Sequence, residues 1–337
     1  MTKTQPAPDT LISPNGQPIY GHFDGIPKSL GVDHFDYRTC MDRKFSRLAK
    51  YFHFKRFQFV SIVTPEYLIG IAIADIRYLG SAFCYVYDTE QQTLTEERFL
   101  RPLDFDKTMA CSPFSGTTHI ASSKLVFSIE QGLWRIKANT QHLKLDVCLL
   151  TQSDSLPLSV NTPTGYSGWT YTQKHNALKV AGTLSVNNRE LDLDRALASY
   201  DYSAGFMRRE TSWRWASLSF QTSAGLFGFN LAAGVNETGS TENVFWVNGY
   251  RHHLGPVHFH FDRLRTLPNW HIYSEDGRVN LSFNPLYQRS EKRNLIILKS
   301  NFRQFIGMFS GSIQDEVGQR HDIDQAVGLT EDHFARW

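Results

Sequence analysis

The chain has 337 residues, and its 35 Lys and Arg residues nearly balance 33 Asp and Glu residues, which leaves a formal net charge of +2. This balance removes the sequence-wide electrostatic attraction that a nucleic acid or an anionic membrane would need. No apolar run approaches the roughly 18 residues of a membrane-spanning helix, so we expect a folded protein that does not span a membrane. At about 150 residues per domain, the length allows two domains or one large β architecture.

The cysteines and the N-terminus indicate the expected compartment. The four cysteines form no Cys-x-x-Cys pair, and their wide spacing matches neither a disulfide framework nor a zinc knuckle, so we expect reduced, mostly buried thiols. The first ten residues lack the apolar stretch of a secretory signal, which makes the cytoplasm the expected compartment. No phosphate loop or dinucleotide fingerprint occurs, and no cofactor is predicted. The cysteines are Cys40, Cys84, Cys111 and Cys148.

The chain begins with an irregular segment. Residues 1–38 are rich in proline and glycine and follow neither a helical nor a strand period, which predicts an arm laid over the fold. A short apolar stripe of Met41, Phe45 and Leu48 then predicts one helix over Thr39–Tyr51.

From Phe57 onward, short runs of β-branched and aromatic residues alternate with turn-forming clusters, a pattern typical of an antiparallel meander. Apolar and polar residues alternate over Lys124–Glu130, which predicts a sheet with one face on a core and the other in solvent. The first predicted strands are Phe57–Val63, Tyr67–Ala74, Leu79–Tyr87, His119–Ile129, Leu133–Ala138 and Leu143–Leu150.

A loop-rich stretch, Ser153–Gly168, predicts a domain boundary, and the strand pattern resumes beyond it. The later predicted strands are Trp169–Gln173, Leu178–Val186, Trp213–Gln221, Gly225–Ala232, Asn243–Val247, Val257–Phe261, Trp270–Tyr273, Val279–Phe283, Leu295–Leu298 and Phe302–Ser310. We therefore predict an all-β protein of two lipocalin-like antiparallel β-barrel domains packed against each other. The arm would cover 1–38, the N-terminal barrel 39–155 and the C-terminal barrel 156–337.

Two tryptophans, Trp213 and Trp215, stand two residues apart on a predicted strand and therefore point to the same face. This aromatic wall either lines a ligand cavity or fills a core. Arg209 and Arg214 flank the wall, and each guanidinium group either completes an internal ion pair or binds the carboxylate of a ligand. The sequence leaves both interpretations open.

Six short motifs are spread along the chain: Cys40–Lys44, Ala74–Tyr78, Trp213–Trp215, Gly228–Leu231, Thr241–Asn243 and Glu331–Trp337. Together they resemble the bacterial family catalogued as domain of unknown function 2804. A second pattern consists of Tyr171–Gln173, Leu178–Leu184, Asp201–Gly205 and the tryptophan pair. This pattern resembles the second domain of the carotenoid hydratase and AttH-like group. That resemblance implies paired lipocalin-like barrels and, in some members, hydration or cyclisation of isoprenoid or polyketide chains.

The resemblance raises the question of acid catalysis. The hydratase group has a histidine after the aspartate of its turn, where this chain has Tyr202. Alkene protonation needs an acid kept protonated by an apolar site, with aromatic faces that stabilise the carbocation. The candidate acids are Asp201, Glu242 and Asp75, and the candidate cation-stabilising residues are Trp213, Trp215 and Tyr202. Each acid also has an ordinary interpretation: a turn cap for Asp201, hairpin-end hydrogen bonding for Glu242 and an ion pair for Asp75.

The family motifs also supply Asn230, Asn243 and Tyr78 as ligand-binding candidates. The closing segment Glu331–Arg336 has two interpretations. Its polar residues either fasten the C-terminus to the barrel or place His333 as a base beside a carboxylate.

Clustered histidines and one basic segment are the remaining patterns that resemble binding sites. Two of the histidines alternate on a predicted strand and could bind a metal with Glu242 or His271 as a third ligand, but solvent-facing histidines give the same pattern, and no metal is predicted. Lys50–Arg56 alternates bases with aromatic residues, but the balanced charge and the lack of an RNA-binding motif exclude a nucleic-acid partner. The histidines are His252, His253, His258 and His260.

The sequence therefore favours a protein that binds an elongated hydrophobic molecule, such as an isoprenoid or a fatty-acyl chain, in an aromatic-lined pocket. The alternative is a cofactor-free hydratase, cyclase or isomerase that acts on such a molecule by acid catalysis. A third interpretation is a scaffold whose barrels are packed and hold no ligand. A hydrophobic small molecule is the expected partner, and the sequence indicates no particular protein partner.

Overall fold

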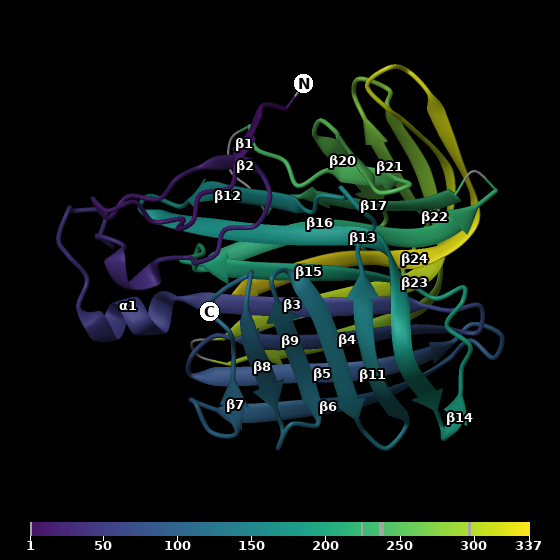
Figure 1. The fold of residues 1–337 in the computed structure, drawn as a ribbon, viewed down its shortest axis with the longest axis horizontal. Helices are drawn as coiled ribbons and strands as arrows, with labels where there is room; N and C mark the ends of the chain where they lie inside the picture. Colours follow the sequence, from purple (N-terminus) through teal and green to yellow (C-terminus); the bar gives the residue numbers. More distant parts are fainter. Residues whose placement is uncertain (1, 224, 236–238, 296–297) are drawn as a thin grey trace. The chain divides into compact units, whose positions relative to one another are not determined.

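The computed structural model describes residues 2–223, 225–235, 239–295 and 298–337, and nearly all of its regular structure is β-strand (Figure 1). From Thr4 onward the chain divides into two compact units, Thr4–Met207 and Arg208–Trp337, called here the N-terminal and C-terminal units. The described strands of the N-terminal unit form a nearly closed barrel, and those of the C-terminal unit form a half-barrel. The predicted all-β class with two lipocalin-like barrel domains is confirmed.

The boundary between the two units lies further along the chain than the loop-rich stretch predicted. The sequence placed the boundary at residues 155/156, whereas the contacts divide the chain after Met207. The reason is strand pairing: β12 (Leu158–Thr164) pairs with β13 (Gly168–Val186), and β13 pairs with β11 (Leu143–Leu150). A strand belongs to the sheet in which it finds hydrogen-bond partners, and proline and glycine content does not report those partners.

The N-terminal unit contains one sheet with the strand order β6-β5-β4-β3-β15-β13-β11-β10-β9-β8-β7. Its ladders are antiparallel except for that between β1 and β2. In Figure 1, helix α1 lies immediately before β3. The remaining elements are β1 (Thr4–Pro6), β2 (Gly21–Asp24), the 3₁₀ turn η1 (Val32–His34), α1 (Arg47–His53), β3 (Lys55–Val63), β4 (Tyr67–Asp75), β5 (Leu79–Asp88), β6 (Thr93–Pro102), β7 (Lys107–Thr108), β8 (Gly116–Ile120), β9 (Leu125–Glu130), β10 (Leu133–Asn139), β14 (Arg189–Glu190) and β15 (Leu197–Gly205).

Two burial patterns occur in this sheet. Strands β9, β10 and β11 alternate between buried and more exposed residues, as the sequence predicted for a one-sided sheet. Strands β3, β4 and β15 are buried on both faces. Of the three, β4 has a nearly continuous apolar sequence, whereas β3 and β15 also bury polar residues such as Gln58, Ser61 and Asp201. The inner face of the barrel carries one apolar cluster that includes Val60, Ile71, Trp134 and Tyr200.

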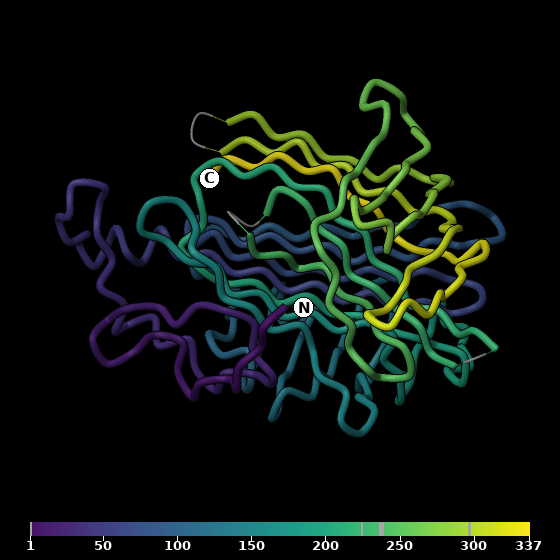
Figure 2. Tube along the Cα trace, turned by 90° about the horizontal axis from the view of Figure 1, so that it is seen from above, coloured from purple at the N-terminus to yellow at the C-terminus, as the bar shows by residue number. Residues whose placement is uncertain are grey.

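The C-terminal unit contains one sheet with the strand order β19-β18-β17-β16-β24-β23-β22-β21-β20. Its three longest strands, β22, β23 and β24, run side by side in green to yellow in Figure 2. Its strands are β16 (Glu210–Thr222), β17 (Gly225–Ala233), β18 (Val244–Val247), β19 (Tyr250–His253), β20 (Val257–Phe261), β21 (Trp270–Ser274), β22 (Val279–Asn294), β23 (Lys299–Gln314) and β24 (Arg320–Arg336).

An apolar cluster also defines the inner face of the C-terminal sheet. It includes Phe283, Phe305 and Phe309. Two glycines make room for this cluster: a Cβ atom on Gly307 would lie 2.7 Å from the Phe283 ring, and one on Gly328 would lie 2.7 Å from the Phe309 ring. The absence of a side chain at these glycines therefore leaves room for the aromatic rings against the strands.

Several predicted elements are corrected by the structure. The helix covers Arg47–His53 and not Thr39–Tyr51. The predicted strand His119–Ile129 is two strands, because Ala121, Ser122 and Ser123 form a left-handed turn without glycine or asparagine to signal it. Strands β6, β15 and β24 were not predicted; β6 and β24 are rich in polar residues. The predicted strand Leu295–Leu298 contains residues 296–297, which lie outside the described residues.

The four cysteines are free thiols. The expectation that most of them are buried is wrong, because Cys40 and Cys111 lie in loops and are exposed, and only Cys84 is fully buried.

Candidate functional site

The strongest candidate site lies on the inner face of the N-terminal barrel, where three polar side chains face the apolar cluster. Gln58 on β3 lies opposite Tyr202 on β15, and Tyr202 lies opposite Gln173 on β13. All three residues are 0% exposed. Neither polar atom of the Gln58 amide, nor the Tyr202 hydroxyl, has a hydrogen-bond partner among the residues that the structure describes.

The neighbouring polar groups, in contrast, satisfy one another. The Gln173 amide nitrogen donates to the Tyr200 hydroxyl over 2.8 Å, and the Tyr171 hydroxyl donates to Gln173 Oε1 over 3.1 Å. Tyr171 also shares a 2.9 Å hydrogen bond with Ser159. Burial raises the pKa of Tyr200 and Tyr202 well above the ordinary value, so both phenols stay neutral at physiological pH.

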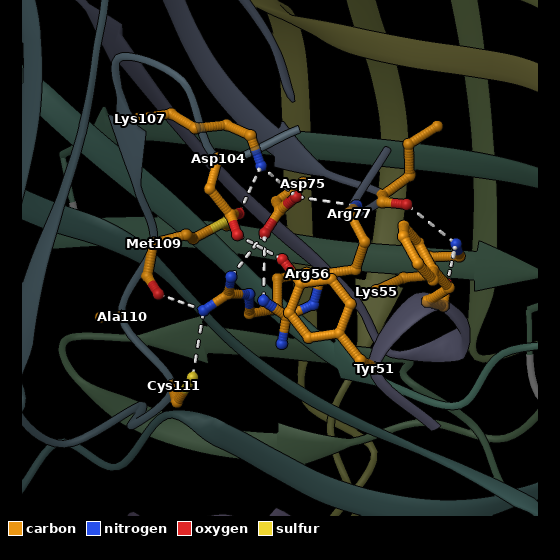
Figure 3. Close-up of polar contacts among 12 residues, drawn as sticks. Tyr51, Lys55, Arg56, Asp75, Arg77, Asp104, Lys107, Met109, Ala110 and Cys111 are labelled. Atoms are coloured by element: carbon orange, nitrogen blue, oxygen red, sulfur yellow. Dashed lines mark hydrogen bonds and ion pairs between the residues drawn. The ribbon is translucent and has the colours of Figure 1, made fainter. Parts of the chain in front are cut away.

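Asp75 lies at the end of β4 in a buried cluster of cations (Figure 3). Its carboxylate accepts from Arg56 Nη2 at 2.5 Å and from Lys107 Nζ at 2.6 Å, and Arg77 Nη1 lies 3.8 Å away. The Asp75 side chain is only 2% exposed. Arg56 also donates to the Met109 carbonyl and to the Cys111 sulfur.

These contacts decide the ionisation state of Asp75. Burial alone would raise the pKa of this carboxyl group, but the hydrogen bonds and charges of Lys107 and Arg56 hold it below the ordinary value. Asp75 is therefore a carboxylate at neutral pH and is unsuited to protonate an alkene. The adjacent candidate Tyr78 lies with its ring 4.9 Å from Lys55 Nζ.

Asp201 and Tyr202 are neighbours in sequence but lie on opposite faces of β15. Asp201 forms an ion pair with Lys174 and accepts a 3.1 Å hydrogen bond from Ser203. Tyr202 faces the inner cluster. The structure therefore does not bring this candidate acid and this candidate cation-stabilising ring together, and Asp201 would have to leave its ion pair before it could donate a proton.

Four other candidates lie together in the C-terminal unit. The Trp215 indole nitrogen donates to Asn230 Oδ1 over 2.7 Å, and the Asn230 amide donates to the Glu242 backbone carbonyl over 2.8 Å. Glu242 is 1% exposed. Asn243 accepts from the Ala232 backbone N–H over 2.7 Å and donates to the Gly255 carbonyl over 2.9 Å, so its side chain bridges two backbone segments. These contacts give the two asparagines a clear structural role.

Trp213 and Trp215 lie on the same face of β16, opposite the face that carries the apolar cluster of Ala216 and Leu218. The Trp213 ring lies 4.2 Å from the ring of His333.

The two arginine candidates are separated. Arg209 is exposed, and its backbone carbonyl accepts a hydrogen bond from the Trp337 backbone N–H. Arg214 lies on the inner face, beside Asp332.

The clustered histidines have other partners. His252 Nδ1 lies 2.7 Å from Glu316, and His258 Nε2 lies 3.3 Å from Glu275. In the part of the chain that the structure describes, no three His, Cys, Asp or Glu residues converge as a metal site would require. Over those same residues, no helix has the length and apolar character needed to cross a membrane.

Sequence reasoning named Arg214 but missed Gln58, Lys107 and the other two arginines around Asp332, which are Arg263 and Arg303. Gln58 interrupts the apolar alternation of β3 at a position that faces the core, and a polar residue at such a position is a detectable signal. Lys107 lies on a two-residue strand, and only the fold brings it to Asp75.

The geometry defines a class of protein: a β-barrel unit and a half-barrel unit in one chain, with buried polar groups inside the barrel that have no hydrogen-bond partner in the described part of the chain. The family model described as a domain of unknown function (DUF2804) matches residues 9–337, and the chain belongs to this family. No curated protein matches it in sequence.

Solved structures share the fold at low sequence identity. An AttH-like protein from Nitrosomonas europaea is 12% identical, with a TM-score of 0.51 over 82% of this chain and 92% of that protein. Kievitone hydratase from Nectria haematococca is also 12% identical, with a TM-score of 0.51 over 84% of this chain and 88% of that enzyme. The structure of CghA with Sch210972 is 7% identical, with a TM-score of 0.57 over 83% and 88% of the two chains.

Proposed function

We propose that the N-terminal barrel binds a small, mainly apolar molecule whose polar group lies at Gln58 and Tyr202. One observation carries the proposal: these two facing residues are fully buried, and their polar atoms lack partners among the described residues. More than nine in ten buried polar groups are hydrogen-bonded, and an unsatisfied one costs roughly 1–3 kcal/mol. A bound ligand would supply the missing partners.

The chemistry of these groups indicates the class of ligand. A glutamine amide and a neutral phenol both donate and accept hydrogen bonds, so they suit a hydroxyl or carbonyl group rather than a cation. The surrounding inner face is apolar and aromatic, and the Trp134 ring stacks on Tyr200 at 4.6 Å. These features support an elongated isoprenoid or acyl chain that ends in such a group. The free cysteines support the cytoplasm as the proposed compartment.

Tyr202→Phe is expected to separate binding from stability. The substitution removes an unpartnered hydroxyl, so the ligand-free protein should be as stable as the wild type or more stable, by about 1 kcal/mol. Retinol, a fluorescent isoprenoid alcohol, should bind at least fivefold more weakly to the variant. Fluorescence titration measures the affinity, and urea unfolding measures the stability.

Tyr200→Phe is the matched control, two residues away on the same strand. It removes a hydroxyl that accepts from Gln173, so it should destabilise the protein by about 1 kcal/mol. If Tyr202→Phe destabilises the protein as much as Tyr200→Phe and leaves retinol binding unchanged, the proposed site is wrong. If retinol and squalene both fail to bind the wild type, the barrel does not bind isoprenoids.

A second candidate is acid-catalysed hydration, cyclisation or isomerisation of the same class of molecule. The nearly complete burial of Glu242 favours it, and the fold likeness to kievitone hydratase supports keeping it. Trp213 and Trp215 would then be the proposed aromatic face. When squalene is incubated in heavy water, the wild type should yield deuterium-labelled product and Glu242→Gln should yield none. If the wild type yields no labelled product, the protein does not catalyse this reaction on squalene.

A further inference from the structure

The inner face of the C-terminal half-barrel carries an unbalanced cluster of charges. Asp332 on β24 lies opposite Arg214 on β16 and opposite Arg303 on β23. Arg263, two residues after β20, donates to both oxygens of the same carboxylate at 2.8 and 3.1 Å. Three guanidinium groups therefore share one carboxylate, which leaves two positive charges uncompensated within the cluster.

Arg214 is the least satisfied of the three. Among the described residues, its only ion pair is a 3.4 Å contact between Nε and Asp332 Oδ1, whereas Arg303 and Arg263 hold the carboxylate by hydrogen bonds. Burial lowers the pKa of Arg214, and the like charges of Arg263 and Arg303 lower it further. The direction of this shift agrees with an excess of positive charge in the cluster. The Arg214 side chain is 27% exposed, so an anion can reach it.

Unsatisfied donors continue from the cluster along the same face. Thr330, two residues from Asp332 on β24, is 0% exposed, and its hydroxyl has no hydrogen-bond partner among the described residues. The Trp270 indole N–H is likewise buried and, within that part of the chain, unpartnered. Thr330 lies opposite Phe305, and the Trp270 ring lies 5.5 Å from the ring of Phe305. Polar donors and aromatic rings therefore alternate immediately beside the positive charges.

We infer that this face binds a carboxylate at the head of an apolar chain, with the carboxylate at Arg214 and Arg303 and the chain along Phe305. A guanidinium fork matches a carboxylate in shape and charge, and the excess positive charge can accept it without unpairing Asp332. Thr330 and Trp270 add donors that only an acceptor-rich group would use. This inference concerns the C-terminal unit and does not depend on the function proposed for the N-terminal barrel.

The test compares cis-parinaric acid with its methyl ester by fluorescence titration at pH 7.5 and fixed ionic strength. The wild type should bind the acid at least tenfold more tightly than the ester. Arg214→Gln should weaken acid binding about tenfold and leave the ester unchanged, because Asp332 keeps two arginine partners. Arg320→Gln is the matched control, since Arg320 is an exposed β24 arginine that pairs with Asp322.

Two further variants test whether Thr330 contributes to binding and whether the effect is specific to this unit. Thr330→Val keeps the shape of the side chain and should weaken acid binding severalfold without lowering the unfolding midpoint. Arg189→Gln, which removes an exposed arginine of the other unit that pairs with Glu66, should leave acid affinity unchanged. The inference is overturned if the ester binds the wild type as tightly as the acid, if neither binds, or if Arg214→Gln behaves like Arg320→Gln. Displacement of the acid by submillimolar inorganic phosphate would also overturn it, in favour of a phosphate site.

Discussion

Asp75→Asn is expected to destabilise the protein by about 3–5 kcal/mol, because it removes the buried carboxylate that pairs with Arg56 and Lys107. Arg56, whose side chain is 5% exposed, would lose its paired carboxylate, and Lys107, which is 4% exposed, would be left with its 3.5 Å contact to the exposed Asp104. The amide keeps the size of the carboxylate, so the loss reports charge and hydrogen bonding rather than packing. Urea unfolding followed by circular dichroism measures the change.

Asp146→Asn provides the control for this prediction. Asp146 also accepts two hydrogen bonds from an arginine, Arg135, but the pair is 37% and 52% exposed. Exposed ion pairs contribute about 0–1 kcal/mol, so this variant should lie close to the wild type. The double variant Arg56→Met, Asp75→Asn should cost less than the sum of the single changes. Equal effects of Asp75→Asn and Asp146→Asn would show that the buried cluster does not stabilise the fold.

His333 should make the stability of the protein depend on pH between about 3 and 6.5. Its ring lies between Trp213 and Phe302, and burial lowers its pKa from 6.5 to about 3. In that range the unfolded chain binds a proton at this residue and the folded chain does not. The free energy of unfolding therefore falls as the pH falls, by up to roughly 1.4 kcal/mol per pH unit.

His333→Phe keeps an aromatic ring in this position and cannot be protonated. Unfolding measured from pH 7 to 4.5 should show a shallower loss of stability in this variant than in the wild type. His258→Gln, an exposed histidine on β20, should keep the wild-type slope. Identical slopes for the wild type and His333→Phe would contradict the buried, neutral histidine. Its low pKa makes His333 a weak base, poorly suited to act as a general base at neutral pH.

The strands that the sequence predicted correctly are those with a strong local pattern. Strand β11 was predicted with the bounds that it has, because Leu143–Leu150 alternates cleanly between buried and solvent-facing positions. Strand β6 escaped prediction because it ends the path of the sheet, where charged residues are tolerated on an edge. Strand β24 escaped prediction because its inner face carries Asp332, whose burial depends on arginines from other strands.

The candidate site could be predicted only in part, because its residues come from strands that are far apart in the sequence. Tyr202 was named from its motif, and the structure places it on the inner face of the barrel. Gln58, the residue that faces Tyr202 across the ladder, lies 144 positions earlier in the chain, and the two meet only through the pairing of β3 with β15. Local spacing carries information about one strand, whereas a site inside a barrel is assembled across strands.

The pairing of β3 with β15 also has a consequence for synthesis on the ribosome. Ser61 and Ser199, which share a hydrogen bond between these strands, are 138 positions apart. At about 5–20 residues per second, the nascent chain waits on the order of ten seconds before β15 can cover that edge of β3. During this interval the meander from β3 to β6 presents an open, apolar edge that can pair with another chain. A chain shortened to residue 155 would keep that edge open permanently and should aggregate as it is made.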